Sequence, residues 1–225
     1  ELVIIDKPAV HLPLETNAIN TGFTPLTINS VGSPTYTTID GKKCIKFESG
    51  KYLTIDSNNI FNLGTNSDFY IEFDAYIQSS QKTRFNTLIS NGYASGYNSN
   101  ISALVISRES DGNNLYIDYG WYRDTSNKFI FDAWNNIKLY RQGNKLYLSL
   151  NDKPFLVNAE KSFNFSNTTF NIGRSALDSS AYMNGYMSNF KMFVGTSEIP
   201  ETYNDKKVLD LDFKPTRKSY LFKDN

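Results

Sequence analysis

Cysteine and histidine are almost absent from this sequence of 225 residues, which contains one of each. Cys44 therefore has no partner for an intramolecular disulfide, and we expect it to be a small buried side chain. His11 is the only imidazole that could act as a base, and it lies in an edge-strand pattern near the N-terminus. Without a Cys/His cluster, the usual zinc sites are excluded. The sequence thus offers little for nucleophilic catalysis and predicts no metal centre.

An excess of charge of one sign and long apolar runs are missing too. The 23 basic and 23 acidic residues give a formal net charge of zero, which argues against binding to nucleic acid or to anionic lipid. No apolar run approaches the ~20 residues of a membrane span, and no signal peptide is recognisable. We therefore expect neither a nucleic-acid partner nor membrane insertion. Because the chain begins at Glu1 rather than Met, we expect it to be a segment of a longer protein.

Alternation of apolar and polar residues is abundant, and it is clearest in residues 134–151. This stretch predicts a β-hairpin around a Gly-Asn turn at positions 143–144, with one buried face. A slip of one residue would mix the two faces, so the pattern predicts the register as well. The predicted pairs are Ile137 with Leu150, Leu139 with Leu148 and, on the outward face, Tyr140 with Tyr147. No group in this hairpin can do acid–base work, and we interpret it as architectural.

Similar patterns recur along the chain, and they predict an all-β protein. Residues 68–77 alternate most regularly, with Phe69, Ile71, Phe73, Ala75 and Ile77 on one face. One or two strands are predicted within residues 1–30, including 9–15, and further strands at residues 42–49, 51–55, 87–90, 102–107, 115–122, 169–172, 185–194, 207–213 and 220–222; one helical turn is predicted at 59–61. No capped amphipathic helix of ten or more residues is predicted. Short strands separated by Gly, Asn and Asp turns favour a two-sheet antiparallel β-sandwich.

We predict a single domain over residues 1–225 with its core at about 9–199. The segments VHLPLE at 10–15 and VLDLDF at 208–213 are weakly similar. Residues 200–225 could therefore add terminal strands to the same sheets or open a further module.

Five motifs occur in a fixed order along the chain: FESGKYLTI at 47–55, DFYIEF at 68–73, the hairpin at 134–151, NIGR at 171–174 and NGYMSNFKMF at 184–193. Together they resemble the laminin-G-like, concanavalin A-like jelly-roll superfamily. The resemblance implies two antiparallel sheets face to face, with the concave one often carrying a glycan or protein site. Such modules occur in bacteriophage tail and receptor-binding proteins, in bacterial surface proteins and beside glycosidases. We therefore expect a virion or extracellular location.

Glu72 and Asp74 suggest a glycosidase, because laminarinase-like enzymes of this broad fold carry Glu-x-Asp-x-x-Glu on one strand. Two such carboxylates can act as nucleophile and acid on a glycosidic bond. Here Ile77 occupies the position corresponding to the final Glu, so the general acid is missing. We interpret the pair as two solvated acids on an outward strand face, and we expect no catalytic residues and no enzyme activity.

No cofactor is expected, although the family resemblance is compatible with one structural calcium ion. Calcium takes six to eight oxygen ligands from Asp, Asn and backbone carbonyls. The candidate ligands are Asp111, Asp118, Asp178 and Asn184. Asp and Asn are also frequent in turns here, and no EF-hand loop is present.

Polar loops with aromatic residues provide the best binding signal. Sugars present apolar C–H faces and hydroxyl groups, so a glycan site combines Tyr or Trp with Asn, Asp or Arg. Strand parity over residues 115–122 predicts that Tyr119 and Trp121 point inward, whereas Tyr116, Asp118 and Tyr122 point outward. The predicted ligand-binding residues are Tyr93, Tyr97, Arg108, Tyr116, Asp118, Trp121, Tyr122, Arg123 and Tyr182.

Three functions follow from these features. The first is a non-catalytic, lectin-like module that binds a cell-surface glycan or host receptor, as part of a phage tail or another virion or surface adhesion protein. The second is a structural module that assembles with neighbouring chains of a virion or surface fibre. The third is a glycoside hydrolase of laminarinase-like type, which the missing general acid disfavours.

Overall fold

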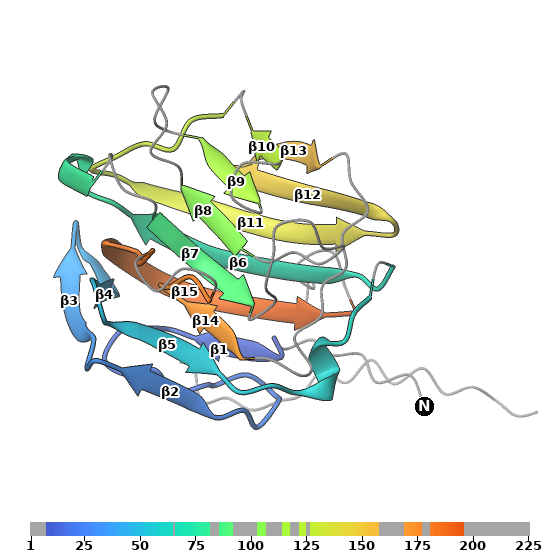
Figure 1. The fold of residues 1–225 in the computed structure, drawn as a ribbon, viewed down its shortest axis with the longest axis horizontal. Helices are drawn as coiled ribbons and strands as arrows, with labels where there is room; N and C mark the ends of the chain where they lie inside the picture. Colours follow the sequence, from blue (N-terminus) through green and yellow to red (C-terminus); the bar gives the residue numbers. More distant parts are fainter. Residues whose placement is uncertain are drawn as a thin grey trace, which may run out of the picture.

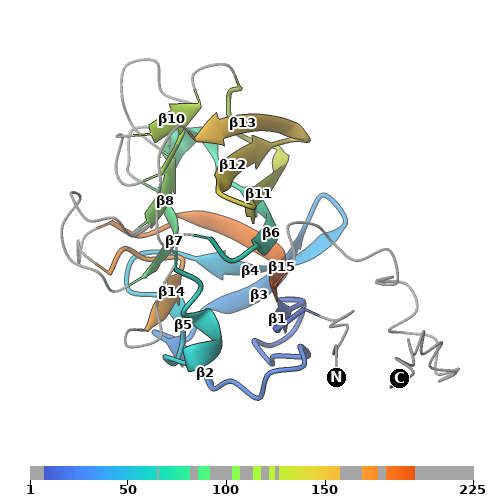
Figure 2. The same ribbon diagram turned by 90° about the vertical axis from the view of Figure 1, so that its right-hand side faces the viewer.

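Two antiparallel β-sheets lie face to face and enclose the hydrophobic core in this computed structural model (Figures 1 and 2). The structure describes residues 8–64, 66–81, 86–91, 103–106, 114–117, 122–124, 127–157, 169–176 and 181–195. Within these ranges the only helical segments are two short 3-10 turns, η1 (Asn59–Phe61) and η2 (Ser79–Gln81). The predicted all-β sandwich is thereby confirmed.

The first sheet has the strand order β13-β12-β11-β6-β15-β4-β3, and β1 pairs separately with β15. Its strands are β1 (Val10–Leu12), β3 (Thr35–Ile39), β4 (Lys42–Phe47), β6 (Phe69–Tyr76), β11 (Trp134–Gln142), β12 (Lys145–Leu150), β13 (Lys153–Val157) and β15 (Gly185–Val194). The second sheet has the order β10-β9-β8-β7-β14-β5-β2. Its strands are β2 (Ile28–Val31), β5 (Tyr52–Ile55), β7 (Asn86–Asn91), β8 (Ala103–Ile106), β9 (Leu115–Ile117), β10 (Tyr122–Asp124) and β14 (Phe170–Ile172).

Strand β6 forms the centre of the first sheet, between β11 and β15. Its predicted inward residues Phe69, Ile71, Phe73 and Ala75 are all fully buried, as is Ile77 just after it. Inward side chains of the second sheet, such as Leu53 and Phe170, complete the core. Burial of alternate residues is the physical result of packing one face of each strand against the opposite sheet.

The hairpin predicted from residues 134–151 is confirmed with its register. Strands β11 and β12 pair Ile137 with Leu150, Leu139 with Leu148 and Tyr140 with Tyr147. The two tyrosine rings stack on the outward face with centroids 5.1 Å apart. Glycine at position 143 adopts a positive φ of 60°, which a tight turn requires.

Most other predicted elements are found, and the differences have local causes. The helical turn at residues 59–61 is confirmed, and β1 ends directly before Pro13, which has no N–H for a sheet. Strands β3 and β13 were not predicted, because their burial patterns lack a regular apolar face. Before the hairpin, Phe129 is buried and packs edge-on against Phe131 with centroids 5.6 Å apart.

Two further predictions concern the extent of the domain and membrane-spanning helices. The predicted strands at 207–213 and 220–222 lie outside the described residues, so the extent of the domain stays a prediction. Among the described residues, no helix has the length and apolar character needed to span a bilayer.

Candidate functional site

The predicted loop site falls mostly outside the part of the chain that the structure describes. This applies to Tyr93, Tyr97, Arg108, Asp118 and Trp121. The backbone of three further predicted residues is placed in the second sheet: Tyr116 in β9, and Tyr122 and Arg123 in the edge strand β10. Their grouping as a ligand site therefore stays a prediction.

The stretch 115–122 is not one strand, and here the sequence-based prediction was wrong. Strands β9 and β10 form an antiparallel pair in which Tyr122 lies opposite Ile117 and Arg123 opposite Tyr116. The chain therefore reverses between residues 117 and 122, a segment that contains Gly120. Strand parity cannot run through a reversal, so the inward and outward assignments based on a single strand do not apply.

Tyr182 is the predicted site residue whose side-chain contacts the structure describes, and it lies in an aromatic and cationic cluster. The guanidinium carbon of Arg174 is 4.8 Å from the ring centroid of Tyr52 and 5.9 Å from that of Tyr182. Arg174 Nη1 donates a hydrogen bond of 2.8 Å to Tyr52 Oη. We call these three residues the Arg174 cluster. All three are half-buried, so they keep part of their surface for a ligand.

Backbone geometry after β14 holds the Arg174 cluster in place. Gly173 has a positive φ of 86°, and a Cβ there would lie 2.8 Å from the ring of Phe47. Only glycine fits both this conformation and this approach. The following segment is anchored by Ser90, whose Oγ donates to Arg174 O at 2.8 Å and accepts from Ala176 N at 2.9 Å. Arg174 and Tyr182 then form an antiparallel bridge.

The Arg174 cluster is separate from the predicted residues of β9 and β10. In the second sheet β14 lies three positions from β9, which corresponds to about 14 Å at ordinary strand spacing. The structure therefore groups Tyr182 with Tyr52 and Arg174, two residues that the sequence-based prediction of the site had missed. Arg174 is part of the NIGR motif, but nothing in the local sequence indicates its contact with Tyr52, which is 122 residues away.

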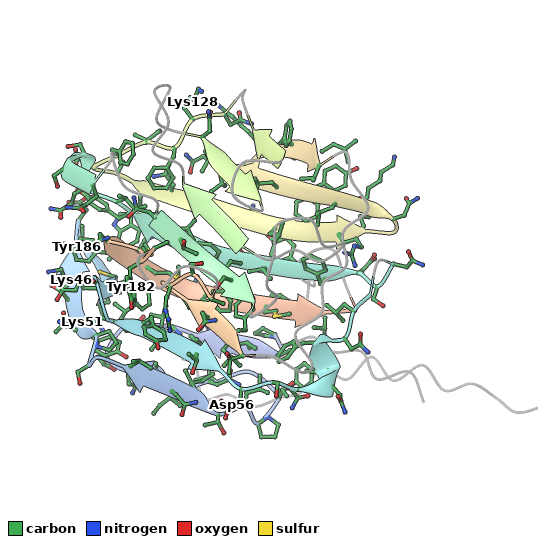
Figure 3. The ribbon with its side chains drawn as sticks, in the orientation of Figure 1. Lys46, Lys51, Asp56, Lys128, Tyr182 and Tyr186 are labelled. Atoms are coloured by element: carbon green, nitrogen blue, oxygen red, sulfur yellow. The ribbon has the colours of Figure 1, made fainter. Side chains whose placement is uncertain are left out.

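Basic side chains surround the junction between β4 and β5, next to Tyr52. Glu48 Oε1 accepts from Lys51 Nζ at 2.6 Å, and Glu48 Oε2 lies 3.1 Å from Lys46 Nζ. Hydrogen bonds from Lys51 and then Lys46 hold the pKa of Glu48 below its ordinary value, so the carboxylate remains ionised. Figure 3 shows Lys46, Lys51, Tyr182 and Tyr186 along the same side of the molecule.

A second aromatic group lies on the outward face of the first sheet. Tyr76 of β6 packs edge-on against Trp134 of β11, with centroids 5.6 Å apart, and against Tyr186 of β15, with centroids 5.8 Å apart. Next to this row, Asp74 and Asn136 face outward from β6 and β11 as partners in the register. We call the surface formed by Tyr76, Trp134, Tyr186, Asp74, Asn136 and Lys42 the Trp134 face.

The turn between β3 and β4 folds over the Trp134 face. In the sheet order β4 lies three positions from β11, or about 14 Å on a flat sheet. Nevertheless Trp134 Nε1 donates to the carbonyl oxygen of Ile39 at 3.1 Å, and Lys42 Nζ lies 5.0 Å from the centroid of the Trp134 ring. The start of β4 must therefore curl toward β11.

A β-bulge in β15 makes this curl possible. Asn189 has a positive φ of 54°, and the pairing of β15 with β6 shifts between Ser188 and Lys191. Before the bulge β15 pairs with β4, whereas after it β15 pairs with β1. Because β1 replaces β4 as the neighbour, the start of β4 is no longer in register with β15 and keeps its pairing with β3. Bulges commonly bend a strand in this way.

Glu72 and Asp74 are on the outward face as predicted, but they are not the solvated acids that the sequence suggested. Their side chains are only 14% and 17% exposed. Asn136 Nδ2 donates to Glu72 Oε1 at 2.9 Å and to Asp74 Oδ1 at 3.2 Å, and Lys42 Nζ donates to Asp74 Oδ2 at 2.8 Å. The cross-strand amide and the lysine explain why two acids can remain in a shielded position. Asn136 Oδ1 is buried and has no hydrogen-bond partner among the described residues.

His11 and Cys44 occupy structural positions. His11 Nε2 lies 3.3 Å from Asn189 Oδ1, and its Nδ1 lies 3.1 Å from Thr21 Oγ1. Cys44 is fully buried, and its thiol donates to the carbonyl of Thr37 at 3.6 Å. Burial raises the pKa of this thiol, which disfavours the reactive thiolate.

The candidate calcium ligands are described only in part. Asp111, Asp118 and Asp178 lie outside the described residues. Asn184 donates through its backbone N to Asn86 Oδ1 at 3.0 Å and through Nδ2 to Tyr182 O at 3.3 Å, so it helps to hold the segment that carries Tyr182. Within the described ranges, no group of three or more His, Cys, Asp or Glu side chains is arranged to hold a metal ion.

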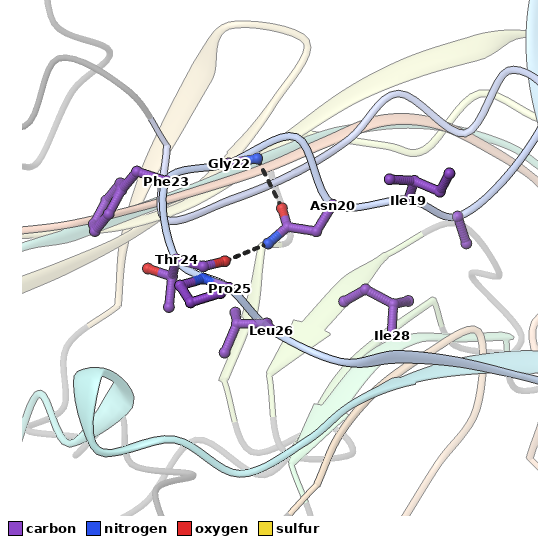
Figure 4. A pocket seen from close by; sticks show the side chains of 9 residues that line it. Ile19, Asn20, Gly22, Phe23, Thr24, Pro25, Leu26 and Ile28 are labelled. Atoms are coloured by element: carbon purple, nitrogen blue, oxygen red, sulfur yellow. Dashed lines mark hydrogen bonds between the residues drawn. The ribbon is translucent and has the colours of Figure 1, made fainter.

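A pocket of about 380 Å³ lies along the segment between β1 and β2 (Figure 4). Asn20 stabilises it, because its Oδ1 accepts from Gly22 N at 2.9 Å and its Nδ2 donates to Thr24 O at 2.8 Å. Its lining contains no charged residue, and Ile19 and Phe23 are 62% and 40% exposed. The pocket therefore lacks the charged groups that distinguish the Arg174 cluster and the Trp134 face.

Comparison with known proteins identifies the fold. No protein-family model and no curated protein sequence matches the chain. Domain 4 of AbnA, an extracellular arabinanase of family GH43 from Geobacillus stearothermophilus, solved with arabinotriose, is similar with a TM-score of 0.59 and 15% identity. That match covers 86% of this chain and 95% of the other.

Botulinum neurotoxin binding domains are similar as well. The serotype D ligand-binding domain, solved with N-acetylneuraminic acid, has a TM-score of 0.59 and 16% identity over 87% of this chain and 49% of that one. The binding domain of neurotoxin DC, solved with rat synaptotagmin II, has a TM-score of 0.57 and 13% identity over 84% and 49%. The chain thus spans about half the length of these toxin domains, with which it shares a lectin-like β-sandwich fold.

Proposed function

We propose that this chain is a non-catalytic recognition module that binds carbohydrate through the Trp134 face. The observation that carries the proposal is the row formed by Tyr76, Trp134 and Tyr186 beside the polar groups of Asp74 and Asn136. A sugar ring has apolar C–H faces that pack on aromatic rings and hydroxyl groups that need donors and acceptors. The Trp134 face offers both within one patch.

The polar part of this patch is suited to hydroxyl groups. Lys42 supplies a donor, whereas the carboxylate of Asp74 and the unpaired Asn136 Oδ1 supply acceptors. A ligand hydroxyl that reached Asn136 Oδ1 would satisfy a buried acceptor, which otherwise costs about 1–3 kcal/mol. The similarity in fold to domains solved with arabinotriose and N-acetylneuraminic acid supports this choice of ligand class, although fold alone does not determine function.

The absence of catalysis is part of the proposal. A glycosidase needs one carboxylic acid that can give a proton to the leaving group. Here Glu72 and Asp74 both accept hydrogen bonds from Asn136, and Asp74 is also ion-paired with Lys42. These contacts engage oxygens of both side chains within the protein, which suits a binding surface better than proton transfer to a leaving group.

We further propose that the module belongs to the laminin-G-like type and acts in a surface adhesion protein, such as a phage tail, where its partner is a host glycan or receptor. The five ordered sequence motifs support this setting. Weak binding at single sites would be strengthened by several copies on one particle. Binding of the isolated domain to candidate host cells, with and without enzymatic removal of surface glycans, tests this setting.

Replacing Trp134 with alanine is expected to weaken glycan binding by roughly tenfold or more, equivalent to about 1.4 kcal/mol, because it removes the largest ring of the aromatic row. A glycan array followed by calorimetry on the best ligand measures the effect. Tyr147→Ala is the matched control: Tyr147 is half-buried on the same outward face, but about 20 Å along the strands from Trp134. Equal losses in both variants, or none in Trp134→Ala with an unchanged melting temperature, would contradict the assignment.

An assembly role is the second candidate, and the open sheet edges favour it. Among the described strands, β2 and β3 each pair with one neighbour only, and β3 (TYTTI) contains neither charge nor proline. Such an edge can accept a strand from a neighbouring chain of a fibre or virion. For an assembly module, we expect light scattering to show oligomers that Thr37→Pro disrupts; a monomer at all concentrations would remove this candidate.

A further inference from the structure

Among the described residues, Arg174 has no anionic partner. None of the carboxylates of the described residues forms an ion pair with it, and only Nη1 donates a side-chain hydrogen bond, to Tyr52. Its Nε is buried without a hydrogen-bond partner among the described residues. A buried donor left unpaired costs about 1–3 kcal/mol. The guanidinium is therefore held in position with donors unused.

The unused donors form a recognisable edge. Because Nη1 is engaged with Tyr52, Nε and Nη2 are left without a hydrogen-bond partner in the described part of the chain, and these two parallel N–H groups match the two oxygens of a carboxylate. Tyr52 and Tyr182 both lie close to the guanidinium, and their ring centroids are 6.2 Å apart. Such pre-organisation lowers the entropic cost of binding.

Local charge favours an anion as well. Lys46, Lys51 and Arg174 provide three cations around the β4–β5 junction, and Glu48 is the one carboxylate that the described residues place in an ion pair there. The bonds of Glu48 go to the two lysines, so Arg174 is not neutralised by it. The two tyrosine rings add the apolar surface on which a sugar ring can pack.

We infer that the Arg174 cluster is a second binding site, which takes an acidic sugar through a bidentate contact between its carboxylate and Arg174. The site belongs to the second sheet, whereas the Trp134 face belongs to the first. It does not depend on the function proposed for the Trp134 face, and either site can fail without the other. A sulfate ester offers similar oxygens but not the planar pair, so carboxylated glycans are the preferred class.

An array of neutral, carboxylated and sulfated glycans, probed with the intact chain and with Arg174→Lys, tests this inference. Lysine keeps the charge but lacks the planar fork, so binding to carboxylated glycans should fall by roughly tenfold while binding to neutral glycans is unchanged. Lys145→Gln, which removes an exposed charge at the β11–β12 turn, should change nothing.

Three results would overturn the inference: no carboxylated glycan bound by the intact chain, retention of such binding in Arg174→Lys, or an equal loss in Lys145→Gln. A preference for sulfated over carboxylated glycans would reject the bidentate carboxylate contact. Trp134→Ala separates the two proposals, because it should reduce binding to neutral glycans and leave the Arg174-dependent binding of carboxylated glycans intact. Melting temperatures of all variants show whether each is folded.

Discussion

Truncation of Phe190 to alanine should lower the free energy of unfolding by about 3–5 kcal/mol, the range for large aromatic residues in a core. Phe190 is fully buried just after the bulge of β15. Its ring stacks on Phe73 of the first sheet, with centroids 5.9 Å apart, and lies 6.2 Å from Phe170 of the second. The substitution therefore leaves a cavity between the two sheets, which a close-packed interior cannot fill without moving either sheet.

Urea denaturation followed by tryptophan fluorescence measures this change. Leu156→Ala is the control, because Leu156 is 46% exposed on the edge strand β13 and should change stability by no more than about 0.5 kcal/mol. If Phe190→Ala does not fold, Phe190→Leu tests the same contact with an expected loss of about 1–2 kcal/mol. A loss below about 1 kcal/mol in Phe190→Ala would show that the sheets do not depend on this contact.

Arg141→Ala should cost a comparable amount, about 3–5 kcal/mol, because it removes two charge-assisted hydrogen bonds and leaves their acceptors unpaired. Arg141 is only 1% exposed, although arginine is usually found on the protein surface. Its Nη1 donates to the carbonyl oxygens of Gly64 at 2.9 Å and Ser67 at 3.2 Å, and its guanidinium lies 5.1 Å from the Phe69 ring. Burial lowers the pKa of this guanidinium, and the negative charge of Asp68 opposes the shift.

Matched variants separate the role of the guanidinium from that of its charge. Arg141→Lys keeps a cation but cannot reproduce the planar donors, so we expect it to recover only part of the loss. Lys145→Ala removes a neighbouring exposed cation and should stay within about 0.5 kcal/mol of the parent chain. If Arg141→Ala is as stable as Lys145→Ala, the hydrogen bonds from Arg141 to the carbonyls of Gly64 and Ser67 do not contribute to the stability of the fold. Hydrogen exchange near residue 67 provides an independent readout of the loop.

Local sequence was sufficient for the strands whose two faces differ in polarity. The β11–β12 hairpin has alternating residues and a turn that fixes the pairing, so its register followed from adjacent residues alone. The same reasoning identified β6 and β15 and their buried faces. It missed β3 and β13, whose patterns are not alternating, and it joined β9 and β10 into one strand because Gly120 was the only sign of a reversal.

The candidate sites depend on contacts between residues that are distant in the sequence. Tyr182 was predicted from its loop composition, but its partners Arg174 and Tyr52 come from other segments of the second sheet. Trp134 was interpreted as part of an architectural hairpin, yet its indole reaches Ile39, 95 residues away. Such contacts depend on how β4 curls, and no local pattern encodes that curl.

The sequence by itself determined the all-β class and the paired faces of the central strands, because these depend on residue types and on short-range periodicity. Only the tertiary structure decided that Glu72 and Asp74 are shielded by Asn136 and Lys42, and that Arg174 lies against two tyrosines with no ion pair to a carboxylate of the described residues. The physical reason is that hydrogen bonds and desolvation depend on which strands become neighbours, and strand order is set by the packing of the whole sandwich.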